Sequence, residues 1–73
     1  MTLQEKIEML EEVMDVEEGE LSEEMVLNEI EEWDSLSTLS LTVEMKKRFG
    51  MNLTEEQIKN FHTVGDICNY IPD

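Results

Sequence analysis

Apolar residues recur every three or four positions along four stretches of the chain, the spacing that places them on one face of an α-helix. The first stretch predicts a helix over about residues 3–15, and Thr2 with Glu5 fits a capping box at its start. Its apolar face is expected to hold Leu3, Ile7, Leu10, Val13 and Met14. Its outward face is expected to hold Glu5, Glu8, Glu11, Glu12 and Asp15.

A second helix is predicted from Ser35 to about Phe49, between Asp34 as N-cap and Gly50 as C-terminal cap. Three cations occupy its last turn, where positive charge suits the negative end of the helix dipole. They are Lys46, Lys47 and Arg48. The inner stripe is expected to comprise Leu36, Leu39, Val43 and Met45, extended by Leu41.

Two further helices follow, each opened by a threonine cap. Thr54 with Gln57 forms a second capping box and opens a short third helix. Thr63 caps the fourth helix, with Asp66 three residues later, and Pro72 ends it. The apolar residues expected to face inward are Ile58 and Phe61, then Val64, Ile67, Cys68 and Ile71.

Residues 16–34 show no sustained periodicity and form a long acidic connection. Its scattered apolar residues are expected to hold it against the core. They are Leu21, Met25, Leu27 and Ile30. An ordered loop of this length is uncommon in a small domain and usually serves a function. The fold class predicted is therefore all-α: a small four-helix bundle of three main helices and one short helix, forming one domain over residues 1–73.

Charge is extreme and unevenly placed. The net charge is -14, and residues 1–34 hold fourteen acids against one base. Such a field repels nucleic acid and anionic membranes and favours basic protein partners. With one cysteine, no apolar run long enough for a membrane span and no signal-peptide pattern, we expect a cytoplasmic monomer.

The candidate metal and catalytic patterns fail on spacing. His62 and Cys68 cannot supply a zinc set. An EF-hand loop starting at Asp15 would need glycine at its sixth position, but Gly19 falls at the fifth. Ser35, His62 and Asp66 offer the residue types of a hydrolase triad without the Gly-x-Ser-x-Gly turn. We therefore expect no metal site and no catalytic residue of these kinds.

Ser35 is the residue most open to a chemical role. With Asp34 as N-cap, its hydroxyl lies in the first helical turn, near solvent and the positive end of the helix dipole. A covalently attached anion such as a phosphodiester would be stabilised there.

The arrangement around Ser35 resembles the acyl carrier protein family over nearly the whole chain. The matching stretches are Trp-Asp-Ser-Leu-Ser-Thr-Leu-Ser-Leu over residues 33–41, Phe49-Gly50, Thr-Val-Gly-Asp-Ile over residues 63–67, and Tyr70-Ile71. The resemblance implies that Ser35, flanked by Asp34 and Leu36, receives 4′-phosphopantetheine from coenzyme A through a phosphopantetheinyl transferase. The thiol of that arm would tether acyl groups as thioesters for acyl-loading and acyl-processing enzymes of fatty acid, polyketide or related biosynthesis.

Two residue sets follow from the resemblance. Residues that could line an acyl cavity, or equally form ordinary core, are Leu36, Leu39, Val43, Ile58, Val64 and Ile67. Candidate partner-docking residues are Trp33, Ser37, Ser40, Glu44 and Lys47.

The second helix departs from the family pattern. Ser37 and Ser40 stand where fatty acid carriers are often acidic, and Trp33 resembles stand-alone carriers of secondary-metabolite or surface-polysaccharide pathways. A specialised carrier is therefore expected, not the housekeeping one. An aminoacyl or peptidyl carrier with the same arm stays open, as does an unmodified acidic adaptor or inhibitor of a basic partner.

Overall fold

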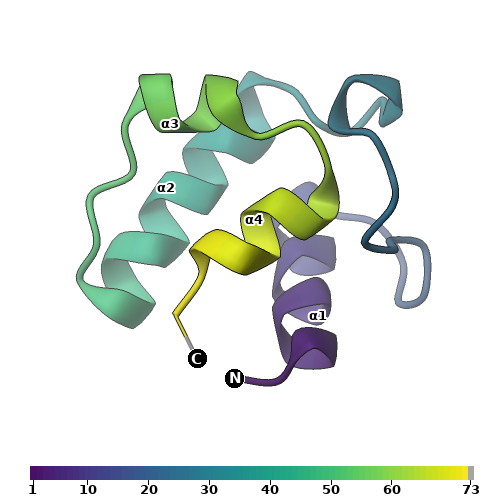
Figure 1. Ribbon diagram of the computed structural model, residues 1–73, viewed down its shortest axis with the longest axis horizontal. Helices are drawn as coiled ribbons and strands as arrows, with labels where there is room; N and C mark the ends of the chain where they lie inside the picture. The colour runs from purple at the N-terminus through teal and green to yellow at the C-terminus, as the bar shows by residue number, and fades with distance from the viewer. Residues whose placement is uncertain (73) are drawn as a thin grey trace.

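The computed structural model describes residues 1–72, which fold into four α-helices without a β-strand (Figure 1). The helices are α1 (Leu3–Met14), α2 (Ser35–Phe49), α3 (Glu55–Asn60) and α4 (Val64–Tyr70), with a single 3-10 turn at Leu27–Glu29. The all-α prediction is confirmed. One detail differs, because α4, expected among the main helices, has only 7 residues against 6 in α3.

The helix ends lie where the capping residues predict them. Both halves of a capping box are present at each of three helix starts, formed by Thr2 with Glu5, Thr54 with Gln57 and Thr63 with Asp66. Gly50 closes α2 in the left-handed region at φ 67°, a conformation that glycine adopts without strain. Each element therefore begins and ends through contacts local in sequence.

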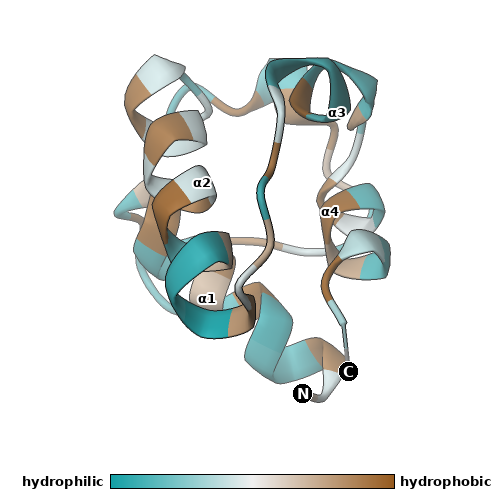
Figure 2. Cartoon of the chain, turned by 90° about the vertical axis from the view of Figure 1, so that its left-hand side faces the viewer, coloured by the Kyte–Doolittle hydropathy of each residue, from teal (hydrophilic) through white to brown (hydrophobic). Residues whose placement is uncertain are grey.

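The core lies between α1, α2 and α4. Helix α1 packs against both α2 and α4, and Figure 2 shows apolar and polar residues together on each of these three helices, as expected of half-buried helices. The largest fully buried side chains are Leu10, Leu27, Leu41, Met45, Val64, Ile67 and Cys68. Within residues 1–72, every helix is too short or too polar to cross a lipid bilayer.

The prediction for the inner face of α2 was wrong at three positions. Leu36, Leu39 and Val43 are 75%, 61% and 49% exposed. The prediction was right for Leu41 and Met45, and the buried face consists of these two residues and Ser37, spaced by four residues. The apolar stripe of Leu36, Leu39 and Val43 therefore faces outward, and Ser37 is the first buried residue of α2.

Glu11 was expected on the outward face of α1, but it is only 3% exposed. Its Oε2 accepts hydrogen bonds from the backbone N–H groups of Gly19 (2.8 Å) and Leu21 (3.1 Å). These donors replace the lost water contacts of Oε2, whereas the buried Oε1 has no hydrogen-bond partner within residues 1–72. Glu11 therefore holds the start of the long loop against α1.

Apolar anchors hold much of the remaining loop. Leu21 and Leu27 are buried and Ile30 is partly buried against the core, as predicted. Met25 was expected among them but is 36% exposed, and its sulfur accepts a hydrogen bond from the N–H of Ser22.

Backbone hydrogen bonds join the middle of this loop to His62, in the turn between α3 and α4, and to the first two residues of α4. They run from Leu27 N to His62 O (2.8 Å), from Val64 N to Met25 O (3.0 Å) and from Gly65 N to Glu23 O (3.0 Å). A Cβ at Gly65 would lie 3.2 Å from the Glu23 carbonyl oxygen, so glycine allows this close approach. The loop is thus an ordered part of the fold.

Candidate functional site

The site is built on the turn into α2. Asp34 has an extended backbone, and its Oδ1 accepts hydrogen bonds from the N–H groups of Leu36 (3.1 Å) and Ser37 (3.0 Å). Ser35 is the first helical residue and is exposed. Its carbonyl accepts from the Thr38 hydroxyl at 3.0 Å, and within residues 1–72 its own hydroxyl has no hydrogen-bond partner. The hydroxyl is therefore open to reaction, beside the positive end of the helix dipole.

Two contacts fix the chain just before this turn. The Trp33 N–H donates to the Ile30 carbonyl at 3.1 Å, and the Trp33 side chain packs partly buried against the core. The buried Ser37 hydroxyl donates to the Glu32 carbonyl. Ser37 therefore ties the last residues of the loop to the first turn of α2, which sets the position of Ser35.

An open groove of about 400 Å³ begins at Ser35 and runs between α2 and α3. Its apolar walls come from Leu39, Leu53 and Ile58. The polar groups along it are Thr38, Thr42 and Glu55. The groove would accommodate a flexible, partly apolar chain attached at Ser35, because polar groups and apolar walls lie within reach of the same hydroxyl.

The other cavity candidates divide between core and surface. Val64 and Ile67 are 0% and 1% exposed and belong to the core of the folded chain. Leu39 and Ile58 line the groove beside Ser35. Val43 instead lines two other hollows along α2, one next to α1 and one next to the α2–α3 connection. Of the six cavity candidates, only Leu39 and Ile58 therefore line the same groove as Ser35.

The docking candidates also lie in unlike surroundings. Ser40 and Lys47 are exposed, and Glu44 accepts a hydrogen bond from Arg48 Nε at 2.7 Å. Trp33 is partly buried, and Ser37 is 4% exposed. A partner cannot reach the Ser37 hydroxyl in this conformation, so Ser37 acts on the site by positioning the chain.

Asp66 has a structural role and is not part of a catalytic triad with His62. Its Oδ2 accepts hydrogen bonds from the N–H groups of His62 (2.9 Å) and Thr63 (3.1 Å), and these bonds lower the pKa of its carboxyl below the ordinary value. His62 itself is exposed. The carboxylate caps α4 and does not orient an imidazole.

The remaining candidate groups fit structural roles. Cys68 is buried, and burial raises the pKa of its thiol, so the reactive thiolate is disfavoured. In the part of the chain that the structure describes, residues 1–72, no three acidic, histidine or cysteine side chains are arranged to hold a metal ion.

Sequence reasoning did not predict the burial of Glu11 or of Ser37, which was expected only as a docking residue, and it did not identify Leu53, which lines the groove beside Ser35. The signal for Glu11 was its spacing, since Ile7, Leu10 and Met14 place it on the apolar face of α1. No comparable signal marked Ser37, because its burial depends on which face of α2 meets α1.

Comparisons with known proteins agree with this geometry. Residues 7–71 match the family model described as a phosphopantetheine attachment site. The chain is 31% identical over 64 residues to the meromycolate extension acyl carrier protein of Mycobacterium leprae, covering 88% of this chain and 56% of that protein. It is also 31% identical over 64 residues to an acyl carrier protein of Thermobifida fusca, covering 88% of this chain and 81% of the relative.

A shorter match, 40% identical over 38 residues, is to an acyl carrier protein of Renibacterium salmoninarum and covers 52% of this chain and 47% of the relative. The chain thus spans about half the length of some of the curated relatives that it matches. No solved structure matches it. The exposed serine at a helix start, the groove beside it and the family match over residues 7–71 agree, and the chain belongs to the acyl carrier protein family, whose members carry covalently attached 4′-phosphopantetheine.

Proposed function

We propose that Ser35 carries the 4′-phosphopantetheine arm and that the protein is a specialised acyl carrier. The matched family region contains four serines, Ser22, Ser35, Ser37 and Ser40. Ser37 is buried and hydrogen-bonded, Ser22 lies in the loop, and Ser40 lies in the interior of α2. Only Ser35 combines an exposed hydroxyl with the first position of a helix, and this observation carries the proposal.

The residues around Ser35 suit a phosphodiester. Asp34 uses its carboxylate to cap the Leu36 and Ser37 amides, which keeps the first turn regular while Ser35 points to solvent. The partial positive charge of the helix start offsets part of the charge of a phosphate attached there. When bound, the group supplies a thiol that holds an acyl chain as a thioester. The neighbouring groove offers Leu39, Leu53 and Ile58 to apolar parts of arm or cargo.

In this proposal the chain itself catalyses nothing. Carriers of this family act with a transferase that attaches the arm and with the biosynthetic enzymes that use it. Tethering raises the effective concentration of the cargo at each enzyme. The requirement for coenzyme A and the single cysteine support a cytoplasmic location.

The modification is tested by incubating the protein with coenzyme A, Mg²⁺ and a broad-specificity phosphopantetheinyl transferase. Intact-mass analysis should show the gain of one arm, lost in Ser35→Ala and retained in the matched controls Ser22→Ala and Ser40→Ala. An unchanged wild-type mass, with the transferase active on another carrier, would favour the unmodified acidic adaptor. Modification of Ser35→Ala would place the arm elsewhere.

Acyl cargo is supported by the three relatives described above, each of which is named an acyl carrier protein. A specialised pathway is supported by α2, whose only acid is Glu44. A reconstituted housekeeping fatty acid synthase should therefore elongate chains poorly on the modified protein. Elongation as fast as on the housekeeping carrier would contradict the specialised assignment, and loading by an adenylating enzyme with an amino acid would favour the aminoacyl carrier.

A further inference from the structure

The groove that begins at Ser35 continues into a second hollow of different charge. It shares Thr42 and Leu53 with a hollow of about 340 Å³ next to the α2–α3 connection. Lys46 and Lys47 line this hollow, and no acid among residues 1–72 does. We call it the lysine hollow, and its other lining residues are Val43, Met51 and Asn52. Groove and hollow therefore form one path from the candidate attachment serine to two cations.

One row of α2 residues forms a wall of this path. The row consists of Ser35, Thr38, Thr42 and Lys46. Their spacing of three or four residues places them on one face of the helix. The rise from the first to the last, eleven residues, is about 16 Å. Both threonine hydroxyls donate to carbonyls of α2, at 3.0 Å and 2.9 Å. Lys46 is therefore the first charged donor on this wall.

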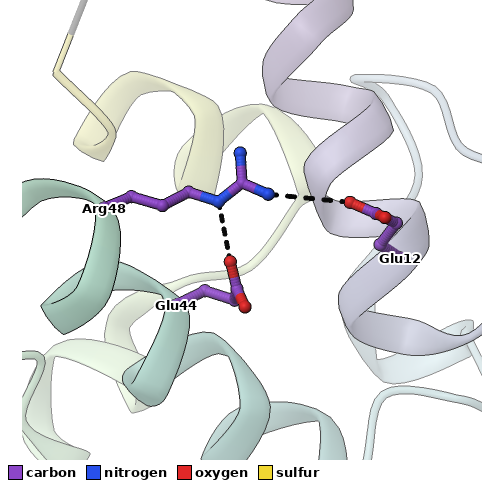
Figure 3. Close-up of polar contacts among 3 residues, drawn as sticks. All are labelled: Glu12, Glu44 and Arg48. Atoms are coloured by element: carbon purple, nitrogen blue, oxygen red, sulfur yellow. Dashed lines mark hydrogen bonds and ion pairs between the residues drawn. The ribbon is translucent and has the colours of Figure 1, made fainter.

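Within residues 1–72 the two lysines of the hollow make no ion pair, although the chain carries nineteen acids and only five lysine or arginine residues. Arg48, the third cation of the last turn, is paired on the other side of α2. Figure 3 shows it reaching toward α1, 2.7 Å from Glu44 and 3.7 Å from Glu12. The Lys46 ammonium donates to the neutral Oδ1 of Asn52 at 3.3 Å. The lysine hollow thus has positive charge that no carboxylate of the described chain neutralises.

The sign of the charge changes along the path. Glu55 lines the groove near Ser35, whereas the far end is lined by the two lysines. An anion is repelled at the near end and attracted at the far end, where the lysines also offset the negative end of the α2 dipole. The walls between are largely apolar, with Leu39, Leu53 and Ile58 followed by Val43 and Met51. This lining fits a flexible apolar chain with a negatively charged end.

We propose that the cargo is an acyl chain whose free end carries a carboxylate, and that the lysine hollow binds this end. The proposal rests on the proposed function, because the chain reaches the hollow from an arm attached at Ser35. Tethering gives the carboxylate a high effective concentration at the lysines, so the weak attraction of exposed ion pairs is enough to hold it. A chain of the same length that ends in a methyl group meets only the apolar walls.

The test compares two cargoes of equal length on the ¹⁵N-labelled protein. A broad-specificity phosphopantetheinyl transferase is supplied with adipoyl- or hexanoyl-coenzyme A, and intact mass checks that each product carries one loaded arm. The amides of Lys46, Lys47 and Asn52 should have different chemical shifts in the adipoyl and hexanoyl forms. Added salt should reduce this difference, because it screens the attraction between exposed charges.

Lysine variants test whether the difference depends on the hollow. Lys46→Gln and Lys47→Gln should each lower the ratio of bound to free carboxylate by about two- to fivefold, the effect of one exposed ion pair, and the double variant should abolish the difference between the cargoes. Lys59→Gln is the matched control, since it removes the same charge from an exposed position of α3 outside the path. It should leave the difference unchanged.

Equal spectra for the two cargoes would overturn the proposal, as would a difference that survives in the double variant. Cargo-dependent shifts at Val13 and Ser40 instead would place the carboxylate between α1 and α2 and also overturn it. Shifts that grow with protein concentration would assign the lysines to acids of a second copy. A wild-type protein that gains no arm refutes the proposed function, whereas a loaded protein without carboxylate-dependent shifts refutes only the role of the lysine hollow.

Discussion

The two faces of α2 each consist of residues three or four positions apart, but one face is buried and the other is exposed. The side made of Ser37, Leu41 and Met45 is buried although it contains a serine, whereas Leu36, Leu39 and Val43 are exposed although all three are apolar. Burial therefore follows which face of α2 meets α1 and the core, not which stripe is more hydrophobic. The exposed apolar stripe next to Ser35 is left available for arm, cargo or partner.

Truncation of one leucine on each side should give the largest difference. Leu41→Ala should lower the free energy of unfolding by about 2–5 kcal/mol, because it opens a cavity at a position that is 1% exposed. Leu39→Ala, at 61% exposure, should change it by no more than about 0.5 kcal/mol. Urea unfolding followed by circular dichroism measures both. Similar losses for the two variants would mean that the outward stripe is also packed.

The same contrast holds between adjacent acids of α1. Glu11→Ala should cost about 2–3 kcal/mol, since it leaves the Gly19 and Leu21 amides without their acceptor. Glu12→Ala, whose side chain is 78% exposed and paired only with Arg48, should cost about 1 kcal/mol or less. Urea midpoints at neutral pH compare them. A Glu12 loss as large as that of Glu11 would remove the distinction between the two faces of α1.

Loss of the cap at the start of α2 should have a smaller effect. Asp34→Ala should destabilise the protein by about 1 kcal/mol, because the Leu36 and Ser37 amides lose their shared acceptor. Asp34→Asn retains an acceptor and should recover most of that loss in thermal unfolding. If the asparagine variant is as unstable as the alanine variant, the carboxylate has a role beyond capping.

The smallest expected effect is a pH dependence at α4. Hydrogen bonds from the His62 and Thr63 amides hold the pKa of Asp66 below the ordinary 3.8. Because this pKa is depressed on folding, its contribution to stability is fully present above pH 3.8 and is lost as the pH falls through the lower folded value. Asp66→Asn should therefore have a lower Tm than the wild type at neutral pH, and the gap should shrink on acidification.

Glu56→Gln removes the same charge from an exposed position of α3 and serves as the control for net charge. Its Tm difference from the wild type should not follow the Asp66 pattern. A gap for Asp66→Asn that stays constant down to the most acidic pH would contradict the role of the charged cap.

The sequence predicted the helix ends well and the faces of α2 poorly, for a physical reason. The caps Thr2, Thr54 and Thr63 each accept a hydrogen bond from the amide three residues later, so a few neighbouring residues are enough to predict each helix start. The buried face of α2 is decided by distant partners. Its sequence contains two overlapping stripes, and the predicted inner face combined Leu36, Leu39 and Val43 of the exposed stripe with Leu41 and Met45 of the buried one. Apolar character alone does not separate them, because exposed apolar residues are common in folded proteins.

At the site, the position of Ser35 was predictable because Asp34 determines it locally. Ser37 and Glu11 were not identified as buried, because each is stabilised by a backbone group of the long loop, Glu32 in one case and Gly19 with Leu21 in the other. The path of an irregular loop leaves no periodic pattern in the sequence. The burial of Ser37 is therefore not visible before the fold is known, whereas the burial of Glu11 could have been inferred from its position on the apolar face of α1.

The hydrogen bonds that join the long loop to the turn before α4 have a mechanical consequence. They tie residues 23–27 to residues 62–65, while Ser37 and Trp33 secure the last turn before Ser35. An arm attached at Ser35, as we propose, would therefore swing from a fixed point, and its reach would be set by the length of the arm alone. An enzyme that acts on such an arm would have to place its reaction centre within one arm length of Ser35 when it docks.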